Sequence, residues 1–296
     1  MSDDKFIKLA EKSINMEHNT ENGYMVCFLG IIDILGFSDF VNNNENAEKL
    51  ITEIISNSFF TNESLLEKIS YKMLSDTLIV YTNENTQYAL INLIFALQNF
   101  SIKCLEKGFL SRGAVVQGKF YLDKDYDIMV SPAFIEAYRL EENIACYPRI
   151  LITNEVYDFL MKNMEFRDDC FFVEKLKFVK DYIENDFDNF YVVRPFRNID
   201  IIAKAIYPNY KDCHGHIFRT NIDDDKKDLI RVLSDIRSWL IDIYKNIELK
   251  NTSVKTKFNY YARQFNEIVE KCSKYIDMEK FKVGLFRLEI TGDHRK

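Results

Sequence analysis

The chain has 296 residues, of which 47% are hydrophobic, and its 24 phenylalanines and 17 tyrosines are enough for a sizeable core. Its formal net charge is -7, with acidic and basic residues interspersed, so we expect no electrostatic surface for nucleic acid. No apolar run has the length of a membrane span, and the acidic first residues do not resemble a signal peptide. We therefore predict a cytoplasmic protein with neither a nucleic-acid nor a membrane partner.

The first two thirds of the chain alternate between strand and helix patterns. After a polar tail over residues 1–23, we predict a strand over 25–33, a helix over 47–56, a hairpin over 69–74 and 78–81, a helix over 86–107 and a strand over 112–118. This order of strand, helix, hairpin, helix and strand is typical of a ferredoxin-like sheet with helices on one face. The expected fold class is therefore α/β (α+β).

Further elements extend this domain, and a different pattern follows it. We predict a strand after the polar stretch 123–127, a helix over 132–142, a strand over 149–153, a helix over 154–161 and a strand over 190–194, which together give one catalytic domain over residues 24–197. In the C-terminal extension, residues 198–296, two long amphipathic patterns over 223–249 and 253–276 predict a helical hairpin. Such a hairpin caps the sheet, forms a dimer interface, or does both.

Asp33 interrupts an otherwise apolar run, residues 26–37. A strand this apolar is normally buried on both faces, where an ionised carboxylate costs several kcal/mol unless it is compensated. Asp33 therefore needs a partner. A metal ion is one candidate, and a neighbouring lysine or main-chain amides are the alternative.

A second carboxylate, Asp76, falls at the turn of the predicted hairpin. On its own, Asp76 is ordinary turn chemistry, but together with Asp33 at an adjacent strand end it predicts a divalent-metal site. Directly after the first strand, Gly36, Phe37 and Ser38 form a predicted tight turn whose main-chain amides suit a phosphate.

Four short segments resemble, in their order, the motifs of class III nucleotidyl cyclases. They are DILGFS at 33–38, KMLSD at 72–76, RGAVVQG at 112–118 and AYRLE at 137–141. The resemblance covers about residues 25–195 and implies a ferredoxin-like core that works as a head-to-tail homodimer with active sites at the interface. The segments 111–114 and 147–150 and the two-helix tail look most like the bacterial pyrimidine cyclases of the Pycsar anti-phage systems.

The resemblance implies that Asp33 and Asp76 hold two Mn²⁺ or Mg²⁺ ions, with the main-chain carbonyl of Ile34 as a further ligand. The turn 36–38 would contact the triphosphate. With the metal ions in place, the ribose 3′-hydroxyl would attack the α-phosphorus in line and release pyrophosphate.

Two basic residues complete the site that the resemblance implies. Arg139 matches the arginine that stabilises the transition state from the other protomer, and Lys72 falls where adenylate cyclases carry a base-reading lysine. The alternative for Arg139 is an ion pair with Glu136 or Glu142 on a solvated helix face.

Two positions depart from the family pattern. Ile135 replaces the asparagine that orients the ribose, and Ile128 falls near the second purine-reading position, where its side chain cannot form a hydrogen bond. Together with the resemblance to the Pycsar cyclases, these departures predict a pyrimidine cyclase, with uridylate cyclase favoured over cytidylate cyclase, although no residue of the sequence separates uracil from cytosine. The resemblance further implies that the 3′,5′-cyclic monophosphate is an anti-phage signal for a separate effector. The alternatives are an adenylate or guanylate cyclase and a catalytically inactive nucleotide-binding module; a diguanylate cyclase ranks last because the GGDEF signature is absent.

Other candidates have weaker patterns. Cys213 and His216 have metal-binding side chains without a second pair, and the six cysteines include no CxxC motif, so we expect a polar loop at 213–216 and reduced, buried thiols. Arg149 could contact a phosphate or be structural. The aromatic residues of 258–265 have helical spacing and predict a core or dimer contact.

Overall fold

The computed structural model describes residues 23–59, 68–123, 125–126, 128–162, 183–196, 222–247, 250–272 and 279–285. The chain divides into two compact units, Met1–Pro195 and Phe196–Lys296. The predicted tail, apart from residue 23, and the loop at 213–216 lie outside the described residues.

An eight-stranded sheet forms the centre of the first unit, in the order β2-β3-β1-β4-β6-β8-β7, with β5 paired to β4 alone. Its strands are β1 (Met25–Leu35), β2 (Ile69–Leu74), β3 (Thr77–Thr82), β4 (Leu110–Asp123), β5 (Ile128–Val130), β6 (Ile150–Ile152), β7 (Ile183–Asn185) and β8 (Tyr191–Val193). The neighbours in β2-β3-β1-β4 are all antiparallel. With α3 (Ala47–Phe59) and α5 (Gln87–Glu106) as connections, these strands make a ferredoxin-like core. The predicted α/β (α+β) fold class is therefore confirmed.

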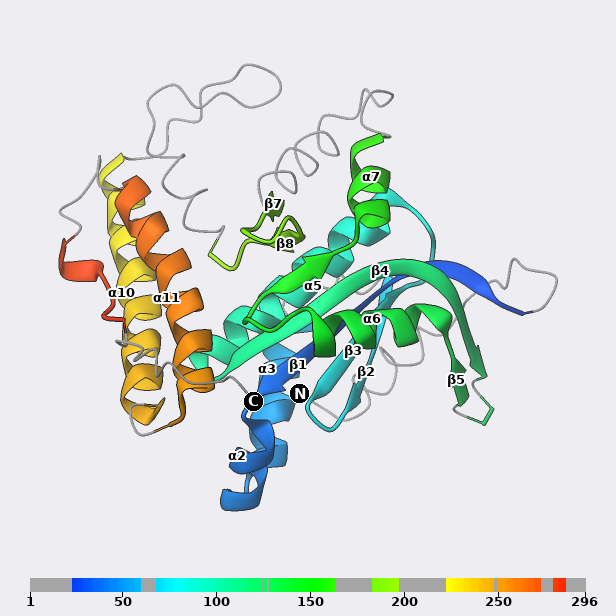
Figure 1. The fold of residues 1–296 in the computed structure, drawn as a ribbon, viewed down its shortest axis with the longest axis horizontal. Helices are drawn as coiled ribbons and strands as arrows, with labels where there is room; N and C mark the ends of the chain where they lie inside the picture. Colours follow the sequence, from blue (N-terminus) through cyan, green and yellow to red (C-terminus); the bar gives the residue numbers. More distant parts are fainter. Residues whose placement is uncertain are drawn as a thin grey trace, which may run out of the picture. The chain divides into compact units, whose positions relative to one another are not determined.

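Alternate residues of β1 pack against different layers of helices. Phe28, Ile32 and Ile34 belong to the core that contains α5, whereas Leu29 and Ile31 belong to the core that contains α6 (Pro132–Asn143). Helices α5 and α6 therefore lie on opposite faces of the sheet (Figure 1). Because side chains alternate along a strand, Asp33 lies on the same face as Ile31, the α6 face.

Helix α5 begins and ends where the sequence predicts. The hydroxyl of Thr86 accepts a hydrogen bond from the amide of Ala89 at 3.2 Å, and Gly108 follows the helix with φ of 87°. Among the described residues, this is the one helix that is long and apolar enough to cross a membrane. However, 72% of its most apolar 18-residue segment is buried inside the fold. Its apolar surface is accounted for by the core.

Two short elements of the first unit were not predicted from the sequence. Helix α2 (Phe37–Asn43) follows Gly36, where we expected only a turn, and its seven residues are too few for a hydrophobic period to be recognised. Strand β7 has three residues and is defined by its pairing with β8. Both extend the predicted fold without changing it. Helix α7 (Asn154–Lys162) matches its prediction.

The second unit contains the predicted helical hairpin, formed by α10 (Ile222–Ile247) and α11 (Thr252–Lys271), followed by the 3-10 helix η2 (Glu279–Phe281). The side chain of Asn251 caps α11 by accepting a hydrogen bond from the amide of Val254 at 3.0 Å. The rings of Tyr261 and Phe265 pack against Phe196. The prediction that the aromatic residues of 258–265 form a core contact is therefore confirmed. The predicted helix end at 273–276 lies outside the described residues.

The described cysteines are free thiols, as predicted. Cys27, Cys104 and Cys272 are buried, but Cys146 is exposed and so differs from the prediction of buried thiols. Burial raises the pKa of Cys27 to about 12, which makes that thiol unreactive at neutral pH.

Candidate active site

The end of β1 and the turn between β2 and β3 are joined by a main-chain hydrogen bond. The amide of Ile34 donates to the carbonyl of Asp76 at 3.1 Å. The turn itself is tight, because Ser75 adopts a left-handed conformation with φ of 57°. Asp33 and Asp76, the two predicted metal ligands, are therefore carried by main-chain segments that are bonded to each other.

Asp33 also contacts a basic residue on the neighbouring strand. Arg112 lies directly opposite Asp33 in the β1–β4 register, and its Nε atom is 3.7 Å from Oδ2 of Asp33. The backbone allows this close pairing because Gly113 follows: a Cβ atom at that position would lie 2.2 Å from the carbonyl oxygen of Ile31. The motif Arg112-Gly113 thus places a guanidinium beside the acidic end of β1.

A third carboxylate, Glu141, reaches the same guanidinium from α6. Its Oε1 atom is 2.6 Å from Nε of Arg112, and its side chain is only 6% exposed. Glu141 is buried because it continues the helix face of Ala133 and Ala137, spaced by four residues, that packs on the sheet. Burial raises the pKa of Glu141 to about 7, against the opposing effect of Arg112 and with the help of neighbouring carboxylates, Asp33 among them.

This set of oxygen donors is suited to Mg²⁺ or Mn²⁺. Carboxylate and main-chain carbonyl oxygens are hard ligands, and Mg²⁺ is commonly held by one or two carboxylates together with substrate phosphates. No group of three or more His, Cys, Asp and Glu side chains with metal-binding geometry is found among the described residues. An ion held by Asp33 and Asp76 would therefore need further oxygen ligands from outside these two side chains, such as those of a bound phosphate.

At the predicted phosphate-binding turn, Gly36 precedes α2, and Phe37 and Ser38 are the first residues of that helix. Gly36 adopts φ of 81°, a conformation that favours glycine. The ring of Phe37 is buried in the core on the α5 side, so only the main chain of Phe37 is left to face a ligand, whereas Ser38 is exposed. Similarly, the side chain of Ile34 is 1% exposed, which leaves its main chain as the part available at the site.

The two predicted basic residues are carried by other elements, Arg139 by α6 and Lys72 by β2. Arg139 is exposed on α6, and no ion pair joins its guanidinium to another described residue; the alternative pairs with Glu136 and Glu142 are not formed. Lys72 lies on β2 opposite Ile79, which the strand alternation places on the α6 face together with Asp33. Within one chain, the main-chain bond at Ile34 links the segments that carry Asp33 and Asp76, and no ion pair between described residues joins Arg139 to either of them.

The residues that depart from the family pattern are exposed. Ile128 on β5 is 50% exposed, and Ile135 on α6 is 52% exposed. They belong to a larger set of exposed apolar side chains on these two elements, Ile128, Val130, Ile135 and Tyr138.

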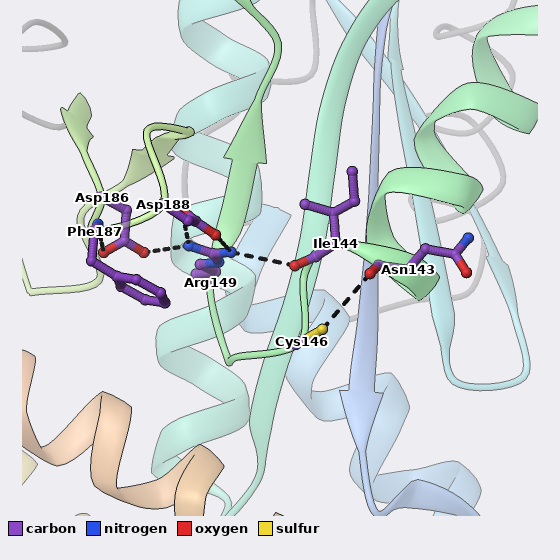
Figure 2. Close-up of polar contacts among 7 residues, drawn as sticks. All are labelled: Asn143, Ile144, Cys146, Arg149, Asp186, Phe187 and Asp188. Carbon is purple, nitrogen blue, oxygen red and sulfur yellow. Dashed lines mark hydrogen bonds and ion pairs between the residues drawn. The ribbon is translucent and has the colours of Figure 1, made fainter.

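Arg149 belongs to a structural cluster in which its two terminal guanidinium nitrogens are paired (Figure 2). The residue Arg149 is 4% exposed. Its guanidinium donates hydrogen bonds to Asp186 at 2.5 Å and to Asp188 at 2.9 Å. Phe187 and Tyr147 lie against it, with ring centroids 5.4 and 5.7 Å from its Cζ atom. Burial lowers the pKa of Arg149, but the hydrogen bonds to Asp188 and Asp186 raise it by more, so the pKa lies above its ordinary value. Of the two predicted roles, the structural one is therefore observed.

Arg112 and Glu141 belong to two of the motifs in the sequence, but no role was predicted for either residue. A signal was present for Glu141, because the spacing Ala133, Ala137, Glu141 puts its carboxylate on the buried stripe of an amphipathic helix. A buried acid on such a stripe requires a cation. For Arg112, the position opposite Asp33 depends on the register between β1 and β4, which the sequence does not show.

No protein-family model matches the chain, and no curated protein matches it. Among solved structures, the chain is similar to the adenylyl cyclase CyaB from P. aeruginosa, with a TM-score of 0.34 and 18% identity, over 50% of this chain and 86% of that one. It is also similar to the guanylyl cyclase Cya2, with a TM-score of 0.32 and 9% identity, over 46% of this chain and 78% of that one. At these values the similarity carries no conclusion about the reaction, and the ferredoxin-like fold rests on the strand order itself.

Proposed function

We propose that this protein is a nucleotidyl cyclase that converts a pyrimidine nucleoside triphosphate, UTP in preference to CTP, to its 3′,5′-cyclic monophosphate and pyrophosphate. The observation that carries the proposal is the 3.1 Å main-chain bond between Ile34 and Asp76, which holds two carboxylate-bearing segments together at the end of a ferredoxin-like sheet. Paired carboxylates at this place suit a two-metal phosphoryl-transfer site.

In this proposal, Asp33 and Asp76 hold two Mn²⁺ or Mg²⁺ ions, with the carbonyl of Ile34 as a further ligand. Bound there, the ions lower the pKa of the ribose 3′-hydroxyl and neutralise triphosphate charge. The amides of the turn 36–38 orient the triphosphate for in-line attack on the α-phosphorus. Pyrophosphate is the leaving group.

The working unit in this proposal is a homodimer. Arg139 is exposed and makes no ion pair with a described residue, so it is available to offset the charge that develops on the α-phosphate in the partner's site. The exposed apolar side chains of Ile128, Val130, Ile135 and Tyr138 are of the kind that a second copy would cover. These features support an interface that includes α6 and β5.

The preference for a pyrimidine rests on the resemblance to the Pycsar cyclases together with the missing purine contacts. Ile128 and Ile135 offer no side-chain hydrogen bond, and a site that reads a base strongly needs such partners. Lys72, on the same face as Asp33, is the residue that would instead favour a purine. The product, a cyclic nucleotide, would act through a separate effector in anti-phage defence, as the resemblance to the Pycsar cyclases implies.

The test is product identification. Purified protein is incubated with Mn²⁺ and ATP, GTP, CTP or UTP, and the products are identified by mass spectrometry. Asp76→Ala is the inactive variant, and Glu155→Ala, which removes an exposed carboxylate at the start of α7, is the matched control. Cyclic UMP or cyclic CMP that is lost only in Asp76→Ala supports the proposal.

Other outcomes identify the alternatives. A cyclic purine product identifies an adenylate or guanylate cyclase. If no nucleotide gives a product but one of them raises the melting temperature, the protein is a nucleotide-binding module without turnover.

A further inference from the structure

Arg112 lies between the carboxylates of Glu141 and Asp33, and it is closer to Glu141. Its Nε atom is 2.6 Å from Oε1 of Glu141 but 3.7 Å from Oδ2 of Asp33. The side chain of Glu141 is also more buried, 6% exposed against 19% for Asp33. Because charge attraction strengthens at short range and in a low-dielectric environment, Glu141 has the stronger hold on the guanidinium.

The position of this guanidinium affects any cation that binds at Asp33. A fixed positive charge beside a carboxylate repels a divalent ion and competes with it for the same oxygens. Neither Nε of Arg112 nor Oε1 of Glu141 has a hydrogen bond to a described residue, so proximity and charge hold the pair rather than an aligned hydrogen bond. Without the charge of Glu141, Arg112 would be left with Asp33 as its described acidic partner.

We propose that Glu141 is a positioning residue, which holds the guanidinium of Arg112 back from Asp33 and so preserves the affinity of that carboxylate for a divalent cation. The inference rests on the proposed metal site. It assigns α6 a part in preparing that site from within the same chain, in addition to carrying Arg139 toward a partner.

The test measures Mn²⁺ binding to the full chain without nucleotide at pH 8, where Glu141 is ionised, by the electron paramagnetic resonance signal of free Mn²⁺. The variant Asp33→Asn measures how much Mn²⁺ binds at other places on the protein. In Glu141→Gln we expect the dissociation constant to rise on the order of tenfold, as loss of one nearby unit charge allows. Glu142→Gln removes the adjacent, exposed carboxylate of the same helix and should change the constant by less than about twofold.

The decisive variant removes both members of the pair. Arg112→Met combined with Glu141→Gln should bind Mn²⁺ at least as tightly as the wild type, because no guanidinium remains to move onto Asp33. Such a double replacement leaves no lone buried charge, so it should stay folded even if Glu141→Gln does not, and thermal unfolding verifies this. A purely structural role for Glu141 would instead make the double variant bind more weakly than the wild type.

The outcomes separate this inference from the proposed function. If Glu141→Gln binds Mn²⁺ as tightly as Glu142→Gln, or if the double variant binds more weakly than the wild type, the positioning role is overturned while the metal site stands. If the wild type binds no more Mn²⁺ than Asp33→Asn, the metal site and the inference both fail.

Discussion

The buried carboxyl of Glu141 should make the stability of the protein depend on pH. Burial raises its pKa to about 7; Arg112 opposes the rise, and the negative charges of Asp33, Glu142 and Asp76 add to it. The ordinary value is 4.5, so the folded protein binds this proton more tightly than the unfolded chain does. The stabilisation that protonated Glu141 gives is therefore complete below about pH 4.5 and is lost as the pH rises through 7.

The size of the effect follows from the two pKa values. Each tenfold difference in proton affinity is worth about 1.4 kcal/mol, so the full difference corresponds to about 3 kcal/mol. Water reaches the neighbouring Asp33, whose side chain is 19% exposed, and screens part of the interaction between Glu141 and the charges around it. We expect the free energy of unfolding to fall by about 2 kcal/mol between pH 5 and pH 8 through Glu141 alone.

The assay is urea unfolding followed by circular dichroism at several pH values. Glu141→Gln keeps the shape of the side chain but cannot titrate, so its stability relative to the wild type should increase by about 2 kcal/mol from pH 5 to pH 8. Glu142→Gln, at an exposed position, corrects for the loss of one negative charge. Parallel pH profiles for the wild type and Glu141→Gln would refute the assignment of a buried, titrating carboxyl.

Three further substitutions test the packing around the site. Gly113→Ala should cost about 3 kcal/mol in urea unfolding, because its Cβ atom would lie 2.2 Å from the carbonyl oxygen of Ile31; an unchanged midpoint would contradict the close approach of β4 to β1. Arg149→Met should destabilise by about 3 kcal/mol because it leaves the partly buried Asp186 and Asp188 without their cation, and a melting temperature equal to that of the wild type would exclude this role. Thr82→Val should cost about 2 kcal/mol in thermal unfolding, since it removes the buried hydroxyl that accepts from the amide of Phe28 at 3.0 Å, and a smaller loss than in a Thr82→Ser control would argue against the bond.

The sequence predicted those parts of the fold that depend on local signals. Helix α5 was readable from its apolar stripe, with Thr86 and Gly108 marking its ends, and the β2–β3 hairpin from its turn residues. The pairing of Asp33 with Asp76 was predicted from the same hairpin and the end of β1. The main-chain bond at Ile34 joins the two segments that carry these residues.

The remaining features depend on contacts between distant residues. Arg149 meets Asp186 and Asp188, which lie 37 and 39 residues further along the chain, so its structural role could not be recognised from neighbouring residues. The contact between Arg112 and Glu141 likewise depends on how α6 packs against β4. The helix spacing predicts that Glu141 is buried, but not which cation it meets.

The turn at Asp76 is secured by its main-chain carbonyl and not by its carboxylate. Replacement of this side chain would therefore leave the bond to β1, and with it the ferredoxin-like core, in place. If Asp76 is a metal ligand, as we propose, a single substitution in evolution would remove that ligand while the folded core stays in place. The step from a catalyst to a sensor of nucleotides would then be short, because folding places little constraint on the side chain at position 76.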